Sequence, residues 1–331
     1  MADRQGRMRK GAVKEMSDIK AVKKIATREA YGNALAEFGE AYPDLVVLDA
    51  DLAAATKTGV FKKKFPERHI DCGIAESNMM GIAAGLSLTG KIPVASTFAM
   101  FAAGRAFEQV RNSIGYPHLN VKIGATHAGI TVGEDGASHQ CNEDIALMRT
   151  IPGMTILNPS DAVEARACVK AALDFQGPVY MRFGRAAVPV IHEENDYKFE
   201  IGKGEVLREG SDITIVATGI MVNSALEAAS KLAEEGVNAE VINICTIKPL
   251  DKELIAASAK KTGKVVTAEE HSVIGGLGGA VCEALAETCP VPVCRIGIQD
   301  VFGESGSAGA LLAKYGLDGD GVYRTVKAFL A

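Results

Sequence analysis

The chain has 331 residues, is 47% hydrophobic and carries a formal net charge of −5. This length is sufficient for two domains with a sizeable core. No apolar run reaches the roughly 18 residues needed to span a bilayer, no apolar signal segment follows the basic N-terminus, and mild acidity argues against a nucleic-acid partner. We therefore expect a soluble, cytoplasmic protein that binds neither membranes nor nucleic acid.

The N-terminal segment differs from the rest of the chain in its charge. The first 24 residues hold eight Lys or Arg against three acids, which is typical of a solvated leader, and we assign residues 1–21 to a flexible basic leader. The seven cysteines are scattered and no pair has C-x-x-C spacing, so a zinc site is not expected and no metal ligand is assigned to this chain.

Short β-branched runs alternate with helical patterns over residues 22–191. The runs predict strands at 45–51, 93–98, 121–127, 155–159 and 179–183. Helices are predicted at 27–41, 76–89, 99–114 and 161–173, the last with Ser160 as its N-cap. Continuous apolar strands that alternate with helices indicate a parallel sheet covered on both faces, which is an α/β fold.

An acidic, polar stretch at 192–204 interrupts this alternation, and we expect a linker there. The pattern then resumes, with strands predicted at 213–219, 239–245, 264–270 and 291–297 and helices at 222–235, 251–260 and 279–288. Residues 205–331 should therefore form a second, smaller α/β domain, so that both domains contain doubly wound, mostly parallel sheets.

The segment HAGITVGEDGASHQ (127–140) is a strong site candidate from its composition and position. It follows a predicted strand, and open parallel sheets bind ligands at the carboxyl ends of their strands. Loops of this length without secondary structure are usually functional or disordered. Glycines at 129, 133 and 136 allow the backbone to approach a ligand closely, and two histidines and two adjacent acids supply polar groups.

Glu76 stands just after a short strand, at the start of the Ala/Gly-rich helix predicted at 76–89. This helix is so small-sided and apolar that we expect it to be buried, which would favour the acid form of a carboxylate at its N-terminus. A glutamate of this kind suits proton transfer. The alternative is an acid that only interacts with the helix dipole.

Aromatic residues make up only 5% of the chain, yet Phe98, Phe101 and Phe107 are close together in sequence. Packing in a helical core accounts for Phe101 and Phe107, whereas Phe98 lies at a strand end where its ring could stack on a planar ligand. The segment GGLGGA (275–280) lacks the G-x-G-x-x-G spacing of a dinucleotide site, and we interpret it as a helix start packed closely on a strand.

Seven motifs together resemble transketolase over roughly residues 22–331. They are ATREAYGNAL (26–35), DAD (49–51), AESNM (75–79), STFAMF (96–101), the His-x7-Asp-x3-His pattern of 127–139, FGR (183–185) and TIKPLD (246–251). They match only the C-terminal half of a full-length transketolase. The resemblance implies a pyrimidine-binding domain at 22–191 and a transketolase C-terminal domain at 205–331, the latter lying away from the chemistry.

The resemblance implies thiamine diphosphate as the cofactor. Glu76 matches the glutamate that bonds N1′ of the aminopyrimidine and activates the cofactor, and Phe98 and Phe101 match the aromatic pocket around the pyrimidine. His139 matches the histidine near the donor hydroxyls and the cofactor amino group, so Glu76 and His139 are the predicted catalytic residues. The diphosphate-binding half of the family is missing from this chain, so the Mg²⁺ ligands are expected on a partner subunit.

The resemblance also implies a sugar-phosphate channel. Arg28, His127 and Arg185 match the residues that hold the phosphate, and an arginine fork binds phosphate oxygens bidentately. Asp135 matches the acid that contacts a substrate hydroxyl. Glu134 is either structural or meets the partner chain, and the sequence does not decide between the two.

One position departs from the family pattern. After DAD, full-length enzymes usually present a serine as a further phosphate ligand, and the aligned residue here is Ala55, followed by Thr56. Either Thr56 supplies the hydroxyl or one phosphate contact is lost, which leaves the preferred sugar open.

The implied function is that of the C-terminal subunit of a two-chain transketolase of the pentose phosphate pathway. It would move a two-carbon ketol unit from a ketose phosphate such as xylulose 5-phosphate to an aldose phosphate such as ribose 5-phosphate. Activity would require the N-terminal, diphosphate-binding subunit, and the chain would homodimerise within an α2β2 heterotetramer.

Three alternative functions share some of these features. The β subunits of 2-oxoacid dehydrogenases share the glutamate but lack the His127, Asp135 and His139 arrangement. Deoxyxylulose-phosphate synthases share GxDGxxHQ, but they typically carry an arginine-containing loop where His127 stands and are normally one chain. A non-catalytic scaffold would have no need of Glu76 at the cofactor position.

Overall fold

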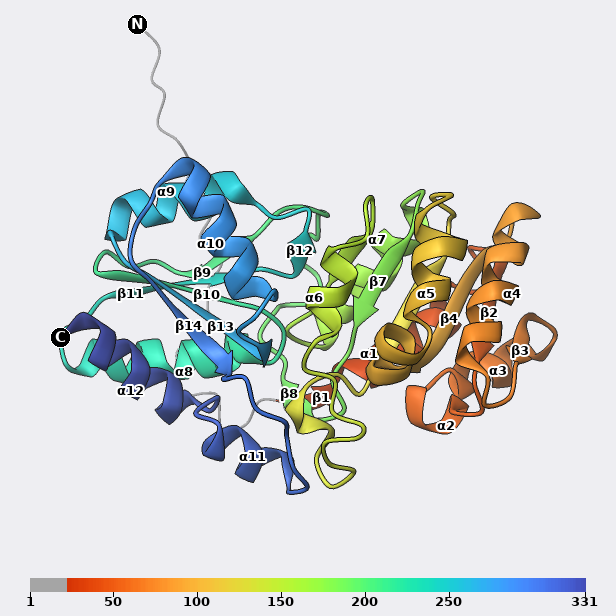
Figure 1. Cartoon of the computed structure of the whole chain (residues 1–331), viewed down its shortest axis with the longest axis horizontal. Helices are drawn as coiled ribbons and strands as arrows, with labels where there is room; N and C mark the ends of the chain where they lie inside the picture. Colours follow the sequence, from red (N-terminus) through yellow and green to blue (C-terminus); the bar gives the residue numbers. More distant parts are fainter. Residues whose placement is uncertain (1–22) are drawn as a thin grey trace, which may run out of the picture.

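The computed structural model describes residues 23–331, and the predicted basic leader at 1–21 lies outside the described residues. The first half of this part folds around a seven-stranded sheet of order β12-β6-β7-β5-β4-β2-β3 (Figure 1). The strands are β2 (Leu45–Asp49), β3 (His69–Asp71), β4 (Ile92–Phe98), β5 (Lys122–Thr126), β6 (Thr155–Leu157), β7 (Val179–Arg182) and β12 (Thr246–Lys248). All neighbours are parallel except β12 and β6, so the predicted parallel sheet is confirmed.

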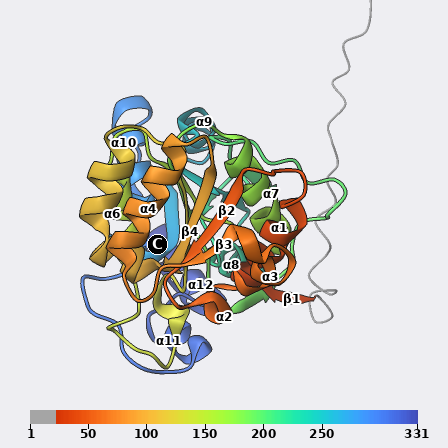
Figure 2. The ribbon, with the colours of Figure 1, turned by 90° about the vertical axis from the view of Figure 1, so that its right-hand side faces the viewer.

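Helices cover both faces of this sheet, and each face has its own apolar core (Figures 1 and 2). The helices of one face are α1 (Thr27–Phe38), α3 (Gly59–Lys64) and α7 (Ala162–Asp174). The helices of the other face are α4 (Glu76–Leu88), η3 (Met100–Arg105), α5 (Phe107–Gln109), η4 (Val110–Gly115) and α6 (Asp144–Arg149). Short elements connect them: α2 (Ala53–Thr56), η2 (Pro66–Arg68) and η5 (Ile130–Val132).

The second half contains a five-stranded sheet of order β14-β13-β10-β11-β9. Its strands are β9 (Glu205–Arg208), β10 (Ile213–Ala217), β11 (Ala239–Asn243), β13 (Val265–Ser272) and β14 (Val293–Ile298), and β9 alone among them pairs antiparallel. Figure 1 shows α9 (Lys252–Thr262) and α10 (Leu277–Thr288) on one side of this sheet, and α8 (Met221–Glu234) and α12 (Gly319–Leu330) on the other. α11 (Ala308–Lys314) lies beside α12, and β1 (Lys24–Ala26) pairs with β8 (Ala187–Pro189) in a separate ribbon.

Several local expectations need correction. The predicted strand at 239–245 ends at Asn243, and β12 just beyond it leaves the second sheet and pairs antiparallel with β6 of the first. The N-cap of α7 is Asp161, whose carboxylate accepts from the Glu164 N–H, instead of Ser160. The predicted helix at 99–114 has π-helical turns at both ends, a geometry that often occurs at functional sites.

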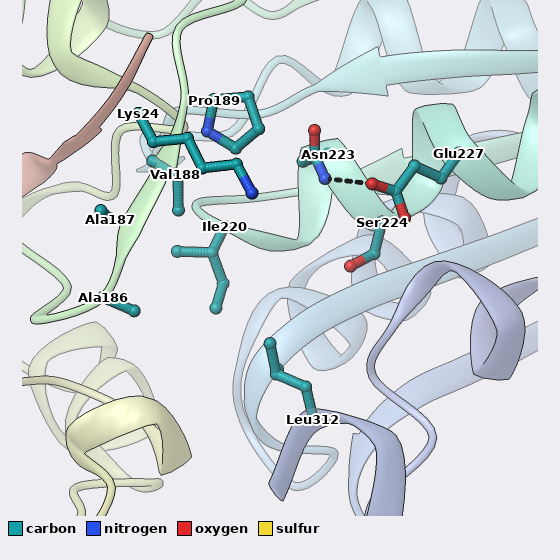
Figure 3. Close-up of a pocket in the computed structure, with 10 residues that line it drawn as sticks. All are labelled: Lys24, Ala186, Ala187, Val188, Pro189, Ile220, Asn223, Ser224, Glu227 and Leu312. Carbon is teal, nitrogen blue, oxygen red and sulfur yellow. Dashed lines mark hydrogen bonds between the residues drawn. The ribbon is translucent and has the colours of Figure 1, made fainter. Parts of the chain in front are cut away.

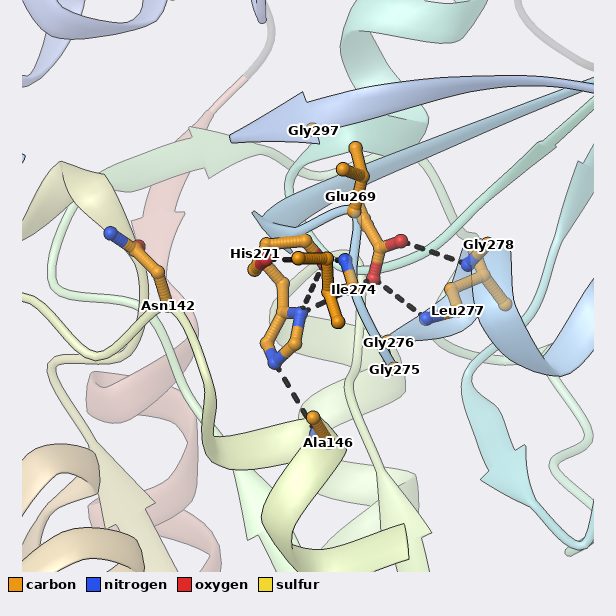
Figure 4. A network of polar contacts seen from close by, with 12 residues as sticks. Asn142, Ala146, Glu269, His271, Ile274, Gly275, Gly276, Leu277, Gly278 and Gly297 are labelled. Atoms are coloured by element: carbon orange, nitrogen blue, oxygen red, sulfur yellow. Dashed lines mark hydrogen bonds and ion pairs between the residues drawn. The ribbon is translucent and has the colours of Figure 1, made fainter. Parts of the chain in front are cut away.

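The GGLGGA segment forms the start of α10 and packs against β13, as predicted (Figure 4). The buried Glu269 carboxylate accepts from the N–H groups of Leu277 (2.6 Å) and Gly278 (2.8 Å) at the helix N-terminus. A Cβ at Gly276 would lie 2.0 Å from Glu269 Oε2, so only glycine allows this approach. No dinucleotide is needed to explain these glycines.

The two halves share buried polar contacts. Arg182 on β7 pairs with Asp144 at 2.9 Å and also donates to the Glu270 carbonyl of β13 at 2.9 Å. His271 Nε2 accepts from the Ala146 N–H of α6 at 3.3 Å (Figure 4). Buried polar groups that are paired in this way hold two elements in one arrangement, because separating them would leave each group unpaired. No helix within residues 23–331 is long and apolar enough to cross a membrane.

Candidate functional site

The predicted site residues line one edge of the seven-stranded sheet. Phe98 ends β4, His127 follows β5 and Arg185 follows β7, while Glu76 follows the edge strand β3. These strands are parallel neighbours, so their carboxyl ends lie together at the edge where such sheets bind ligands. The strand order also separates the candidates, because β7 and β3 lie on opposite sides of β5 and β4.

Arg28, His127 and Arg185, which we call the anion cluster, lie close together. Arg28 enters from the first turn of α1, and its Nη1 donates to His127 Nε2 (2.9 Å) and to the Ala55 carbonyl (3.0 Å). Arg185 is tied to the same turn because the Gly184 N–H donates to Thr27 Oγ1 at 2.8 Å. Burial and the charge of Arg185 both lower the pKa of Arg28, so the two guanidiniums repel each other.

His127 is buried in the anion cluster as a neutral imidazole. Burial and the neighbouring cations Arg28 and Arg185 lower its pKa to about 3. Because Arg28 donates to Nε2, the proton stays on Nδ1, which contacts Thr126 Oγ1 at 2.9 Å. The residue has a φ of 56°, a left-handed conformation that costs energy outside glycine and is found at functional sites.

Glu134 has a partner within this chain. Its carboxylate is exposed and accepts from Arg185 Nη1 at 2.9 Å, and this contact and the residue's own N–H lower its pKa. Glu134 therefore pairs within the chain with a member of the anion cluster. A surface pair of this kind contributes little to stability, so the carboxylate can yield to a bound anion.

Thr56 cannot supply the hydroxyl that the sequence left in question. It is fully buried, and its Oγ1 donates to Asp49 Oδ2 at 2.8 Å. Asp49 also accepts from Thr58 Oγ1 at 2.8 Å and from the Leu52 N–H, so the first acid of DAD holds the 52–58 turn together. The side chains of Ala55 and Thr56 are therefore both excluded as anion contacts.

Aromatic rings connect the anion cluster to the rest of the site. The Phe98 ring stacks on the His127 imidazole with centroids 3.8 Å apart, and on Phe101 at 5.7 Å. Phe101 in turn meets His139 edge-on at 5.6 Å. One face of Phe98 is thus occupied by His127, which leaves the half-buried Phe101 and the edge of Phe98 for a planar ligand.

Glu76 is the first residue of α4 and is only 2% exposed. Both of its oxygens accept from a single nitrogen, Arg105 Nη1, at 2.9 and 3.1 Å. The same guanidinium lies over the Phe101 ring, 4.4 Å from its centroid. The sequence did not predict the role of Arg105, because Arg105 and Glu76 are 29 positions apart. The one available signal was the four-residue spacing between Phe101 and Arg105, which places both on one helical face.

The expectation that the helix at 76–89 is buried is wrong for one of its faces. Leu88 is 75% exposed, and the preceding Ile74 is 77% exposed. A Cβ placed on Gly81 or Gly85 would meet nothing within 4 Å. Ser77, Gly81, Gly85 and Leu88 share a helical face, which we call the open α4 face. An apolar helix with an uncovered face is typical of a surface that another chain covers.

Two predicted residues lie on the glycine-rich loop. His139 is half-buried beside Phe101, whereas Asp135 is exposed and makes no hydrogen bond to another residue within 23–331. The loop rests on the second half of the chain: the Thr131 N–H donates to Glu270 Oε1 at 2.6 Å, and Gln140 Nε2 donates to the Glu304 carbonyl at 2.9 Å. The C-terminal half therefore supports this loop directly.

A cavity of about 430 Å³ lies beside the site and not within it (Figure 3). Its walls come from the β1–β8 ribbon, α8 and α11, and it is lined by Lys24, Ala186, Ala187, Val188, Pro189, Ile220, Asn223, Ser224, Glu227 and Leu312. None of these is a predicted site residue, although Ala186 directly follows Arg185. In residues 23–331 no group of three or more His, Cys, Asp or Glu side chains is arranged to hold a metal ion.

Comparison with known families assigns both halves of the chain. Residues 23–190 match the model of the transketolase pyrimidine binding domain, and residues 202–322 match that of the transketolase C-terminal domain. A pyrimidine binding domain of this family implies dependence on thiamine diphosphate.

Relatives of similar length support the same assignment. A putative transketolase C-terminal section of Methanocaldococcus jannaschii is 52% identical over 301 residues, covering 90% of this chain and 94% of the relative. A 6-deoxy-6-sulfo-D-fructose transketolase subunit of a Clostridium species is 48% identical over 297 residues, covering 90% and 92%.

Among solved structures, a split gene transketolase described as an inactive beta4 tetramer superposes with a TM-score of 0.87 and 58% identity, covering 92% of this chain and 98% of that one. The chain therefore belongs to the transketolase family, in which it corresponds to a C-terminal subunit made of the pyrimidine-binding and C-terminal domains.

Proposed function

We propose that the chain is one subunit of a two-chain, thiamine diphosphate-dependent transketolase. The complex transfers a two-carbon ketol unit from a ketose phosphate such as xylulose 5-phosphate to an aldose phosphate such as ribose 5-phosphate, as in the pentose phosphate pathway. One observation carries this proposal: a buried glutamate and a cluster of cations lie at the same sheet edge and are joined by aromatic rings.

The residues around Glu76 fit the aminopyrimidine of the cofactor. A carboxylate at the start of a helix can hydrogen-bond a ring nitrogen, and Phe101 offers an aromatic face beside it. Bound thiamine diphosphate supplies the carbon nucleophile and electron sink for carbon–carbon bond cleavage. Both Glu76 oxygens accept from Arg105 in this structure, and each has a further lone pair with which it can contact the ring nitrogen.

The other residues act on the substrate. Arg28 and Arg185 bind the terminal phosphate, with His127 holding the Arg28 fork in place through its unprotonated Nε2. His139 and Asp135 hydrogen-bond the hydroxyls nearer the cofactor, His139 from beside Phe101 and Asp135 after the exposed loop closes on the sugar. Positioning by groups at both ends of the sugar lowers the barrier, because the reacting bond is held in one orientation.

We propose that the open α4 face and Ile74 are covered by other subunits. The first of these is a separate N-terminal chain that supplies the diphosphate site and the Mg²⁺ ligands, and the second is another copy of this chain, giving an α2β2 heterotetramer. The exposed apolar surface supports this assembly, since isolated soluble chains rarely leave such a patch uncovered. The predicted domain limits (22–191, 192–204 and 205–331) and the cytoplasmic location remain predictions.

The test is co-expression of this chain with the chain encoded beside it, followed by a ketol-transfer assay with thiamine diphosphate and Mg²⁺. We expect the two chains to purify as one complex that converts xylulose 5-phosphate and ribose 5-phosphate. Either chain alone should show no turnover. Turnover by this chain alone would refute the two-chain assignment, and an assembled complex without ketol transfer would refute the proposed reaction.

A further inference from the structure

We propose that Lys57 is a fourth member of the anion cluster and makes the site selective for sugars that end in a doubly charged phosphate. This inference rests on the proposed function, because it concerns the substrate of the same site. The turn at 55–57 has one side chain left to contact an anion, since Ala55 has no donor and the Thr56 hydroxyl is held by Asp49. Lys57 is that side chain.

Close packing of the 55–57 turn against α1 fixes the position of the Lys57 backbone. A Cβ at Gly32 would lie 2.4 Å from the Lys57 carbonyl oxygen and 2.5 Å from the Lys57 Cβ. Only glycine at this position therefore allows Lys57 to pack so closely against α1. Gly32 is four residues after Arg28 and therefore lies on the same face of α1. Arg28 also donates to the Ala55 carbonyl in the same turn, so Lys57 packs one helical turn from the Arg28 side chain.

Lys57 is the C-cap of α2 and adopts the left-handed backbone common at this position, although it is not glycine. Its φ is 71°, in the left-handed region that glycine or asparagine adopts more easily. His127 and Asp51, just after strands β5 and β2 that flank β4, are also left-handed. Strained residues of this kind cluster where a side chain must be aimed at a ligand.

The charge of Lys57 has no counterion among residues 23–331. The side chain is half-buried, and it forms no ion pair with any carboxylate in residues 23–331. It nevertheless acts on the same imidazole as the two arginines, because the charges of Arg28, Arg185 and Lys57 all help to lower the pKa of His127. Like charges held together in this way repel each other, and a bound anion would relieve the repulsion.

A polar atom beside these cations also lacks a partner. Arg28 Nε is buried and makes no hydrogen bond to any residue in the described part of the chain, although a buried donor without an acceptor costs free energy. An anion held between Arg28 and Lys57 would supply the missing acceptor. This is a second observation, independent of charge, that points to an anionic ligand at this place.

The number of charges favours phosphate among the anions that a sugar can carry. Three cations, Arg28, Lys57 and Arg185, outnumber the two carboxylates that act on them, Glu134 on Arg185 and Glu29 on Arg28, so the cluster keeps a net positive charge before a substrate binds. A sugar phosphate carries about −1.5 to −2 and is attracted to this excess more strongly than a sulfonate, which carries a single negative charge.

The experiment compares two donors that differ only in the phosphate: xylulose 5-phosphate and xylulose, each with glycolaldehyde as an acceptor without phosphate. Lys57→Asn removes the charge and keeps a residue that tolerates the left-handed backbone, while Lys57→Arg keeps the charge. In the complex with its partner chain, Lys57→Asn should lower kcat/KM for xylulose 5-phosphate about tenfold more than for xylulose. Lys57→Arg should recover most of this loss.

An equal loss with both donors, or no loss with either, would overturn the role of Lys57. If the wild-type complex uses neither donor, the proposed function is wrong. The role of Lys57 is then tested separately, by measuring the binding of a sugar phosphate. Titration calorimetry of the same complex with ribose 5-phosphate should give a Kd about tenfold higher for Lys57→Asn than for the wild type. Equal Kd values would refute the assignment.

Discussion

The anion cluster and the surroundings of Glu76 lie at the same sheet edge but differ in how complete they are. The anion cluster is assembled inside one chain: His127 is buried, Arg28 is anchored to Ala55, and Arg185 is tied to α1 through Gly184. Glu76 is buried too, but its partner Arg105 is half exposed, and the helix that Glu76 begins has an uncovered face. The chain therefore forms the anion cluster by itself, whereas the surroundings of Glu76, which we call the unfinished end of the site, are only partly enclosed.

The anion cluster and the surroundings of Glu76 differ because the first must bind a phosphate and the second must activate a cofactor. Binding a phosphate needs several charges held against their mutual repulsion, which a single folded core can do at the ends of adjacent strands. Activating a cofactor needs a desolvated carboxylate and a second wall. That wall is absent from residues 23–331, and the apolar residues around α4 indicate where another chain would supply it.

The largest effect is expected at the unfinished end. Glu76→Gln keeps the size of the side chain but removes the carboxylate, and ketol transfer by the assembled complex should fall by about 10²–10⁴. Chromatographic assembly with the partner should be unchanged, since the side chain is buried within this chain. Near-wild-type turnover would show that Glu76 is not a catalytic residue. The contrast between the anion cluster and the surroundings of Glu76 would then lose its main support.

The next effect is expected in the anion cluster. Arg28→Lys keeps a positive charge but loses the fork that reaches both His127 and Ala55, and Arg28→Met loses the charge as well. We expect KM for xylulose 5-phosphate to rise about tenfold for lysine and about thirtyfold or more for methionine. Steady-state kinetics with the assembled complex measure both values, and equal KM for all three proteins would contradict the assignment.

A smaller effect is expected from filling the open α4 face. Gly85→Leu adds a side chain into open space, so the chain should keep its melting temperature, but the complex should be weakened about tenfold by the clash with a covering subunit. Gly309→Leu on α11 is the matched control, because a Cβ there also meets nothing within 4 Å. Similar Kd values for both variants in sedimentation or light-scattering titrations would show that this face stays uncovered.

The last prediction concerns the pH dependence of stability and not the activity or assembly of the complex. Burial and nearby cations lower the pKa of His127 to about 3, whereas an unfolded chain protonates histidine below about pH 6.5. The unfolded state therefore binds more protons, and stability should fall as the pH drops from about 6.5 towards about 3, by at most about 1.4 kcal/mol for each pH unit. His127→Asn should flatten this dependence in urea unfolding, and an unchanged slope would mean that His127 already carries a proton in the native state.

Much of the fold could be predicted because its strands are short, apolar and regularly spaced. Runs such as LVVLD and KIGAT are buried on both faces, so their composition alone indicates central parallel strands. The antiparallel strand β12 could not be predicted in the same way. Residues 246–248 belong to the second domain in sequence, and only the packing of the two halves pairs them with β6.

For the site, the sequence by itself determined which side chains are available at the ends of the parallel strands, because the positions of strands and loops along the chain follow from the alternation of elements. Glu76, Phe98 and His127 were identified in this way, whereas Arg185 was identified through the resemblance to transketolase. Tertiary structure alone decided which partner each of them meets: Arg105 for Glu76, Glu134 for Arg185, and Asp49 for the Thr56 hydroxyl. These pairs join residues whose distance is set by packing across helices and loops, and local periodicity carries no information about such contacts.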